Sequence, residues 1–183
     1  MIRVPLRTPS HRHLAARCLL LLLAALPLGC GYALVGRGTN IPESIRSVYL
    51  SPLENSTRRA EVEQILTRAL AEELVTRKRF TLVNEAGQGD GVIAGKVVGF
   101  DTTPLTFDDQ GRATEYQITI TASMSFRDRV ADKVLWSNDR YIYKESYQVD
   151  PSEQRYFDRE KIAIEEAAGR FARTVVIDVL EGF

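Results

Sequence analysis

The thiol of Cys30 has the clearest chemical context of any side chain in this sequence. Residues 1–17 carry four arginines and no acidic residue, and Cys18–Leu28 is an 11-residue, mostly apolar run. That run is shorter than the roughly 20 apolar residues that a helix needs to cross a bilayer. A basic segment, a short apolar segment and a small residue, here Gly29, are typical of a signal peptide that is cleaved. We therefore expect residues 1–29 to be removed and Cys30 to begin the mature chain.

The residues before Cys30 resemble the lipobox of bacterial lipoproteins, in which an aliphatic residue and two small residues precede an acylated cysteine. Pro27 stands where the aliphatic residue is usual, and Leu28 where a small one is usual. The resemblance implies a covalent lipid on Cys30 with several acyl chains, whereas one chain binds membranes only marginally. Gly31 in place of Asp then implies the periplasmic face of the outer membrane. The alternative is a short N-terminal anchor that is never cleaved.

After the expected cleavage point the chain contains few residues suited to acid–base or metal chemistry. Residues 30–183 contain no histidine, and Cys30 is their only cysteine. These absences exclude a disulfide, a Cys/His zinc site and a histidine general base. An enzyme built on carboxylates or on a Ser–Lys pair is the catalytic alternative. We expect a protein that is not an enzyme, with no metal and no cofactor besides the lipid on Cys30.

The expected mature chain has the size of one domain and is slightly acidic. Without the four arginines of residues 1–29 it has 20 basic and 24 acidic residues, a formal net charge of −4. A general nucleic-acid binder would show a basic excess, so we expect no nucleic-acid partner. Residues 30–44 include glycines, Asn40 and Pro42 and are expected to form a lipidated tether. Residues 45–183 are then expected to fold as a single domain.

Two clusters of cations are the candidate binding residues of this domain. One cluster closes a predicted helix at residues 77–79, and the other flanks a predicted charged turn at residues 127–133. Arginine suits phosphate groups, which makes both clusters candidates for contact with anionic phosphate groups. The alternatives are cations that complement the helix C-terminus and a solvated turn. The candidate contacts are Arg77, Lys78, Arg127, Arg129 and Lys133.

Neither the glycine-rich segment nor the paired acids predict a catalytic or nucleotide site. The segment Gly87–Gly91 precedes a predicted strand rather than a helix, and no Gly-Lys-Ser/Thr follows it. The adjacent acids Glu72-Glu73 and Glu165-Glu166 lie on predicted helices, where neighbouring side chains point in different directions. We interpret the glycines as a loop and the acids as solvated surface.

The hydrophobic pattern predicts two helices and five strands. Apolar residues at three- and four-residue spacing predict helices over 59–78 and 153–181, and alternation or short apolar runs predict strands over 45–53, 80–83, 91–102, 114–126 and 134–149. This order predicts an α+β fold, a two-layer sandwich with two amphipathic helices packed on one face of a mostly antiparallel sheet of four or five strands.

Alternation is strict over residues 114–126, where apolar and polar side chains exchange at every position. This pattern predicts a sheet with one buried and one solvated face. The alternation changes phase between Trp136 and Tyr141, which predicts a bulge. Gly95 and Gly99 are spaced to share one face of their strand, and a bare face there would let a helix approach closely.

Short motifs in a fixed order resemble the LptE family of lipopolysaccharide-assembly lipoproteins across essentially the whole expected mature chain. They are Cys30-Gly31-Tyr32, Val48–Thr57, Glu63, Thr67, Ala69-Leu70, Glu73-Leu74, Gly95-Lys96-Val97, Phe100, Pro104, Phe107-Asp108, Gly111, Leu135-Trp136 and Val179–Phe183. Each motif is loose by itself, and their order together with the lipobox carries the resemblance.

The resemblance implies a non-enzymatic lipoprotein that sits partly inside the LptD β-barrel and binds lipopolysaccharide for its delivery to the outer leaflet. A polar sheet face suits the polar interior of such a barrel. A second interpretation shares the same lipobox and fold. In it the chain is a lipoprotein of another envelope secretion or assembly complex and acts as an oligomerising binding module.

Overall fold

The computed structural model describes residues 41–150 and 156–181. The predicted signal peptide, Cys30 and the tether up to residue 40 lie outside the described residues. Ile41 is already part of the hydrophobic core, with 4% of its surface exposed. Within the described residues, no helix combines the length and apolar character needed to span a bilayer.

The described chain forms six strands, two long helices and one 3₁₀ turn. In chain order they are β1 (Ser47–Leu50), β2 (Glu54–Asn55), α2 (Val62–Arg77), β3 (Thr81–Val83), η2 (Ala86–Gln88), β4 (Gly91–Phe107), β5 (Ala113–Asp128), β6 (Lys133–Gln148) and α3 (Tyr156–Glu181). The predicted element types and their order are confirmed.

The six strands form one mixed sheet in the order β3-β1-β4-β5-β6, and β2 pairs with β4 beyond the end of β1. The pairs β1–β3, β1–β4 and β2–β4 are parallel, while β4–β5 and β5–β6 are antiparallel. The prediction of four or five mostly antiparallel strands was therefore only partly right. Because α2 carries the chain back from β1 to β3, these two strands run in the same direction.

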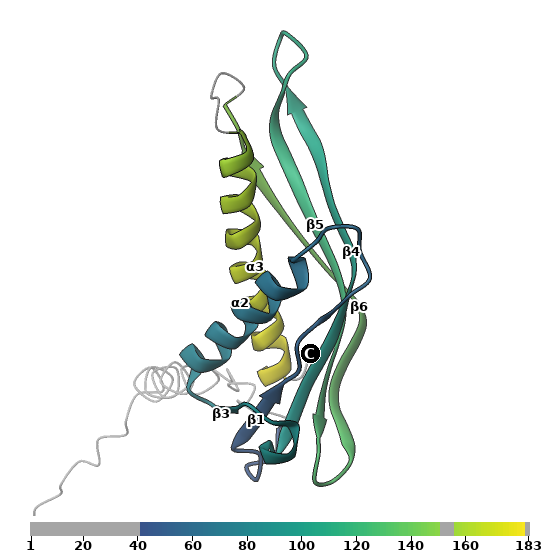
Figure 1. Cartoon of the computed structure of the whole chain (residues 1–183), viewed down its shortest axis with the longest axis vertical. Coiled ribbons are helices and arrows are strands. Elements are labelled where there is room, and N and C mark those ends of the chain that lie inside the picture. Colours follow the sequence, from purple (N-terminus) through teal and green to yellow (C-terminus); the bar gives the residue numbers. More distant parts are fainter. Residues whose placement is uncertain (1–40, 151–155, 182–183) are drawn as a thin grey trace, which may run out of the picture. The chain divides into compact units, whose positions relative to one another are not determined.

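Both helices lie on the same side of the sheet (Figure 1). Their apolar stripes, represented by Leu66 and Leu70 on α2 and by Phe171 and Val175 on α3, are almost completely buried. On β5 the side chains at even positions from Ile118 to Phe126 are also buried. The core thus fills the space between one sheet face and the two helices, as the two periodicities predicted.

Bulges change which side chains share a face. The predicted irregularity between Trp136 and Tyr141 is confirmed by a register shift at this point of the β5–β6 ladder. A second shift between Val97 and Gly99 was not predicted. It places Gly95 opposite the buried Met124 and Gly99 opposite Thr121, so the two glycines face opposite sides of the sheet and the prediction of a shared bare face was wrong.

Candidate functional site

The two predicted cation clusters lie at the same end of the sheet, where β1, β3 and β4 begin and β5 ends, but toward opposite edges, beside β3 and β6. The amide of Thr81 donates to the Arg46 carbonyl, and the amide of Arg129 donates to the Asp90 carbonyl. The ring centroids of Phe80 and Phe126 lie 5.8 Å apart. We call this region the basic end and define it by Arg46, Arg77, Lys78, Arg79, Arg127, Arg129 and Lys133.

The candidate residues differ in how far their charges are already used within the protein. Arg77 pairs with Glu73 one helical turn away, at 2.6 Å. Arg127 pairs with Asp132, and Nε of Arg129 donates to the Gly89 carbonyl at 2.6 Å. These contacts hold three of the five predicted cations within local structure.

The remaining two candidates present their ammonium groups at the surface. Lys78 ends α2 in a left-handed conformation, with φ 53°, and is exposed. Lys133 is exposed at the first position of β6. The ammonium group of lysine is a strongly hydrated point charge on a flexible side chain. It can therefore pair with a phosphate group without being held in a fixed position beforehand.

Asp90 organises the basic end from its centre. Its carboxylate accepts hydrogen bonds from the amides of Ser47, at 2.9 Å, and Arg46, at 3.0 Å, and from the Ser47 hydroxyl at 2.9 Å. The Ser47 amide, then the Arg46 amide and the Ser47 hydroxyl, lower the pKa of Asp90, and the charge of Arg129 acts in the same direction. The ionised Asp90 therefore joins the start of β1 to the start of β4.

Asp128 shapes the neighbouring turn between β5 and β6. It is 7% exposed, and its Oδ1 accepts hydrogen bonds from the amides of Val130 and Ala131 at 2.9 and 2.8 Å. Val130 is consequently held at the turn with 74% of its surface exposed. Asp90, Asp128 and Asp132 are thus engaged in hydrogen bonds or ion pairs. The cations Arg46, Lys78 and Lys133 are exposed in the same region.

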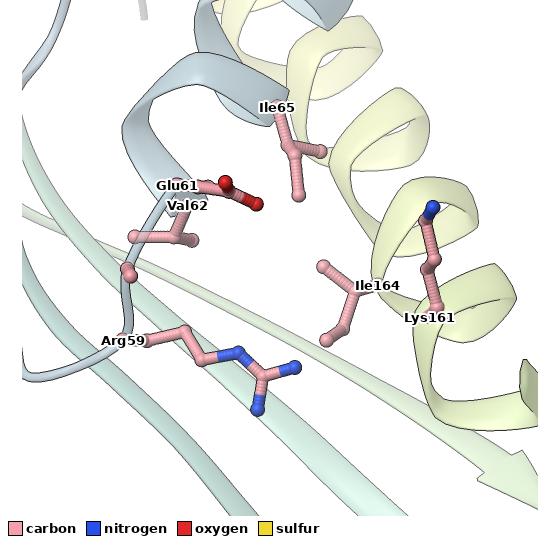
Figure 2. A pocket seen from close by; sticks show the side chains of 7 residues that line it. Arg59, Glu61, Val62, Ile65, Lys161 and Ile164 are labelled. Carbon is pink, nitrogen blue, oxygen red and sulfur yellow. The ribbon is translucent and has the colours of Figure 1, made fainter. Parts of the chain in front are cut away.

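A small pocket lies between the N-terminal parts of the two helices and was not predicted (Figure 2). It has a volume of about 250 Å³ and an apolar wall of Val62, Ile65 and Ile164. Arg59 and Lys161 also line it, and Arg59 pairs with Glu160 at 3.1 Å. Small-molecule sites usually enclose roughly 300–1,000 Å³, so this pocket can hold only part of a large ligand.

The second candidate surface is the sheet face that neither helix covers. We call it the open face and define it by the alternate β5 side chains Glu115, Gln117, Thr119, Thr121, Ser123 and Ser125. Opposite residues of a ladder share a face, so Lys144 and Ser146 of β6 extend this surface, together with Ile142, an apolar residue that is 49% exposed. The strict alternation of residues 114–126 predicted this polar face correctly.

The described residues contain no group of three or more His, Cys, Asp or Glu side chains that could hold a metal ion. Their polar groups instead form a hydroxyl-rich surface and a set of surface cations.

Comparisons with solved structures show where this fold occurs. The hypothetical protein CT253 from Chlamydia trachomatis is 15% identical with a TM-score of 0.52, over 76% of this chain and 97% of that one. Protein XCC0632 from Xanthomonas campestris is 11% identical with a TM-score of 0.53, over 77% and 88%. Rare lipoprotein B from Shewanella oneidensis is 17% identical with a TM-score of 0.49, over 73% and 92%. At these identities the first two likenesses show the fold alone.

A comparison with curated proteins found no match. The sequence-family comparison is decisive, because the family model described as "LptE: Lipopolysaccharide-assembly" matches residues 45–179. That match includes all six strands, α2 and nearly all of α3. The chain therefore belongs to the LptE family of lipopolysaccharide-assembly proteins.

Proposed function

We propose that this protein is a lipoprotein anchored through Cys30 at the periplasmic face of the outer membrane. There it would assemble with an LptD-type β-barrel and bind lipopolysaccharide destined for the outer leaflet. The family match over residues 45–179 carries the proposal. The proposal also draws on the N-terminal sequence, in which a basic segment and a short apolar run precede Cys30.

The open face supports the barrel partner. Thr119, Thr121 and Ser123 lie in the middle of the sheet, each only partly exposed, and no helix among the described residues covers them. The interiors of large β-barrels are polar, so hydroxyl groups on the open face can exchange hydrogen bonds with water for hydrogen bonds with the lumen wall. A plug bound in this way would present its helices to the remaining lumen or to the periplasm.

The basic end supports lipopolysaccharide binding, because phosphate groups of the lipid favour cations. We propose that Arg77, Lys78, Arg127, Arg129 and Lys133 contribute to this contact. The exposed Lys78 and Lys133 should contribute most. Arg77 and Arg127 would first have to leave Glu73 and Asp132. Exposed ion pairs of this kind stabilise a protein by only about 0–1 kcal/mol, so replacing them by pairs with phosphate groups costs little free energy.

The barrel partner is tested by affinity purification of the full chain from detergent-extracted outer membranes. The expected result is stoichiometric recovery of one large β-barrel protein. Recovery of the chain alone, or as a homo-oligomeric ring in size-exclusion chromatography, would falsify the plug role. Mass spectrometry of the same sample tests the anchor, because an acylated Cys30 adds the mass of its lipid to the N-terminal peptide.

Lipopolysaccharide binding is tested with charge reversals in the purified chain. Lys78→Glu and Lys133→Glu should each weaken binding several-fold, and Arg77, Arg127 and Arg129 replaced by Glu should weaken it less. Arg58→Glu is the matched control, because Arg58 is exposed in the loop before α2, at the opposite end of that helix from Lys78. If all five variants bind as the unchanged protein does, the candidate contacts are only structural cations.

A further inference from the structure

The end of the sheet opposite the basic end carries a hairpin tip, defined here as residues 101–115. The outer edge of β4 is paired with β2 only as far as Val97. Beyond that point no described strand pairs with this edge, and β4 continues for ten residues to Phe107. In Figure 1 the turn between β4 and β5 extends past the start of α3.

Two large apolar side chains are exposed at this tip. Leu105 is 47% exposed and Phe107 is 56% exposed. The ladder is shifted between Pro104 and Thr106, which leaves Leu105 without a partner on β5. Bulges of this kind disrupt the ladder locally and are common at the edges of sheets. Leu105 and Phe107 lie two residues apart on β4, and neighbouring exposed apolar side chains are candidates for a binding surface.

The turn at the tip is held by hydrogen bonds within its own residues. Oδ1 of Asp108 accepts hydrogen bonds from the amides of Gln110 and Arg112 at 2.9 and 2.8 Å, and Oδ2 accepts from Nε of Arg112 at 2.8 Å. The Arg112 amide is the main reason that the pKa of Asp108 is lowered. Gly111 supplies the positive φ of 75° that closes the turn. A preformed tip loses little conformational entropy on binding.

The charge of the tip indicates what it can bind. Residues 101–115 contain four acids, Asp101, Asp108, Asp109 and Glu115, against one base, Arg112, a net charge of −3. An anionic lipid surface would repel this charge, as would lipopolysaccharide. The tip therefore differs in chemistry from the basic end, although both are ends of the same sheet.

A second copy of this chain is also a poor partner for the tip. Pro104 removes one amide donor from the edge of β4, and two register shifts interrupt its regular backbone near Leu105. Proline and bulges are the usual means by which an edge strand is protected from pairing with another strand. Contact at the tip must then come from side chains, with apolar burial at the centre and charge around it.

We propose that the hairpin tip is a docking site for a protein surface in which lysines or arginines surround an apolar recess. Leu105 and Phe107 would fill the recess, and Asp109 would face the surrounding cations. This inference goes beyond the proposed function, because it assigns a protein contact to a particular end of the domain and does not depend on the lipid contact at the basic end.

The experiment places a photo-crosslinking amino acid at position 107 of the full chain, expressed in a Gram-negative envelope. Position 130 is the control, because Val130 is even more exposed and lies at the other end of the sheet. Illumination should link position 107, but not position 130, to another protein, and the linked peptide should contain lysine or arginine near the attachment point. Asp109→Lys should reduce this adduct roughly three- to fivefold, as expected for reversal of one surface charge contact. Asp139→Lys, an exposed reversal on β6, should leave it unchanged.

Several outcomes would overturn the inference. They are an adduct with lipid or with a second copy of the chain, equal adducts from both positions with the same protein, no adduct, and an adduct unaffected by Asp109→Lys. Recovery of a β-barrel with the unchanged protein tests the proposed function separately. A barrel recovered without an adduct at position 107 would contradict this inference alone.

Discussion

Three tyrosines on β6 face the helix layer, and their hydroxyl groups are in different situations. The Tyr141 hydroxyl donates to Oδ2 of Asp178 at 2.7 Å, and the Tyr143 hydroxyl donates to Oε2 of Glu145 at 2.8 Å. The Tyr147 hydroxyl is buried and has no hydrogen-bond partner among the described residues. Burial, followed by the charge of Glu160, raises the pKa of Tyr147 to about 12. Tyr147 therefore remains protonated without an acceptor.

Replacement of these tyrosines by phenylalanine should have opposite effects on stability. Tyr141→Phe deprives the half-buried Asp178 of a donor and should lower the free energy of unfolding by about 1–2 kcal/mol. Tyr147→Phe removes an unsatisfied buried hydroxyl while the ring contact with Tyr116 remains, and it should be neutral or stabilising by up to about 1 kcal/mol. Urea unfolding followed by circular dichroism measures both changes. Equal destabilisation by the two variants would contradict this assignment.

Asp90 makes a pH-dependent contribution to the stability of the folded protein, because its pKa is lower in the folded state than in the unfolded chain. Its contribution is present above the ordinary aspartate pKa of about 3.9 and is lost as the pH falls through the lower folded value. Asp90→Asn should lower the melting temperature at pH 7, and the difference from the unchanged protein should shrink below about pH 4. Asp109→Asn, in the exposed turn, serves as the control. A difference that stays constant from pH 7 to pH 3 would contradict the role of Asp90.

At the scale of elements, the local periodicity was sufficient for most of the fold. The stripes of α2 and α3 and the alternation of β5 lie within single elements, so they could be recognised without knowledge of the partners. Parallel pairing of β1 with β3 and β4 depends on contacts between segments more than 30 residues apart. Likewise, β2 contains only two residues, and it exists because it continues the edge of β4.

Gly95 shows how a local spacing rule can fail. An added Cβ would clash with Sδ of Met124 and lie 2.8 Å from the Ser123 carbonyl oxygen and 3.0 Å from Cδ2 of Leu53, so β5 and Leu53, and not a helix, require the glycine. Gly95→Ala should cost about 1–3 kcal/mol of stability, since part of the obstacle is backbone. Gly169→Ala on α3 is the matched change, because a Cβ there meets nothing within 4 Å. It should stabilise the protein by about 0.5–1 kcal/mol. The free energy of unfolding of both variants is measured by chemical denaturation. A Gly95→Ala variant that is more stable than the unchanged protein would refute the packing argument.

At the scale of the whole molecule, the candidate surfaces were only partly predictable. The cations at 77–79 and 127–133 were visible as separate clusters, and the sheet topology is what brings them to one end. Arg46 was missed because a single arginine before a strand has no local signal. The pocket beside Arg59 and Lys161 was missed because it forms between helices separated by about 100 residues. The open face was predictable, because alternation within one strand defines it.

The two faces of the sheet should therefore respond differently to the same substitution. Thr121→Arg changes the centre of the open face, where a bulky cation can remain in solvent, so the melting temperature should fall only slightly. It should nevertheless abolish recovery of the β-barrel partner, because an arginine cannot fit between two closely packed polar surfaces. Thr174→Arg makes the same change at an exposed position of α3 and should leave both stability and recovery unchanged. If Thr121→Arg recovers the barrel as well as Thr174→Arg does, the open face is not the contact surface and the helix layer becomes the next candidate.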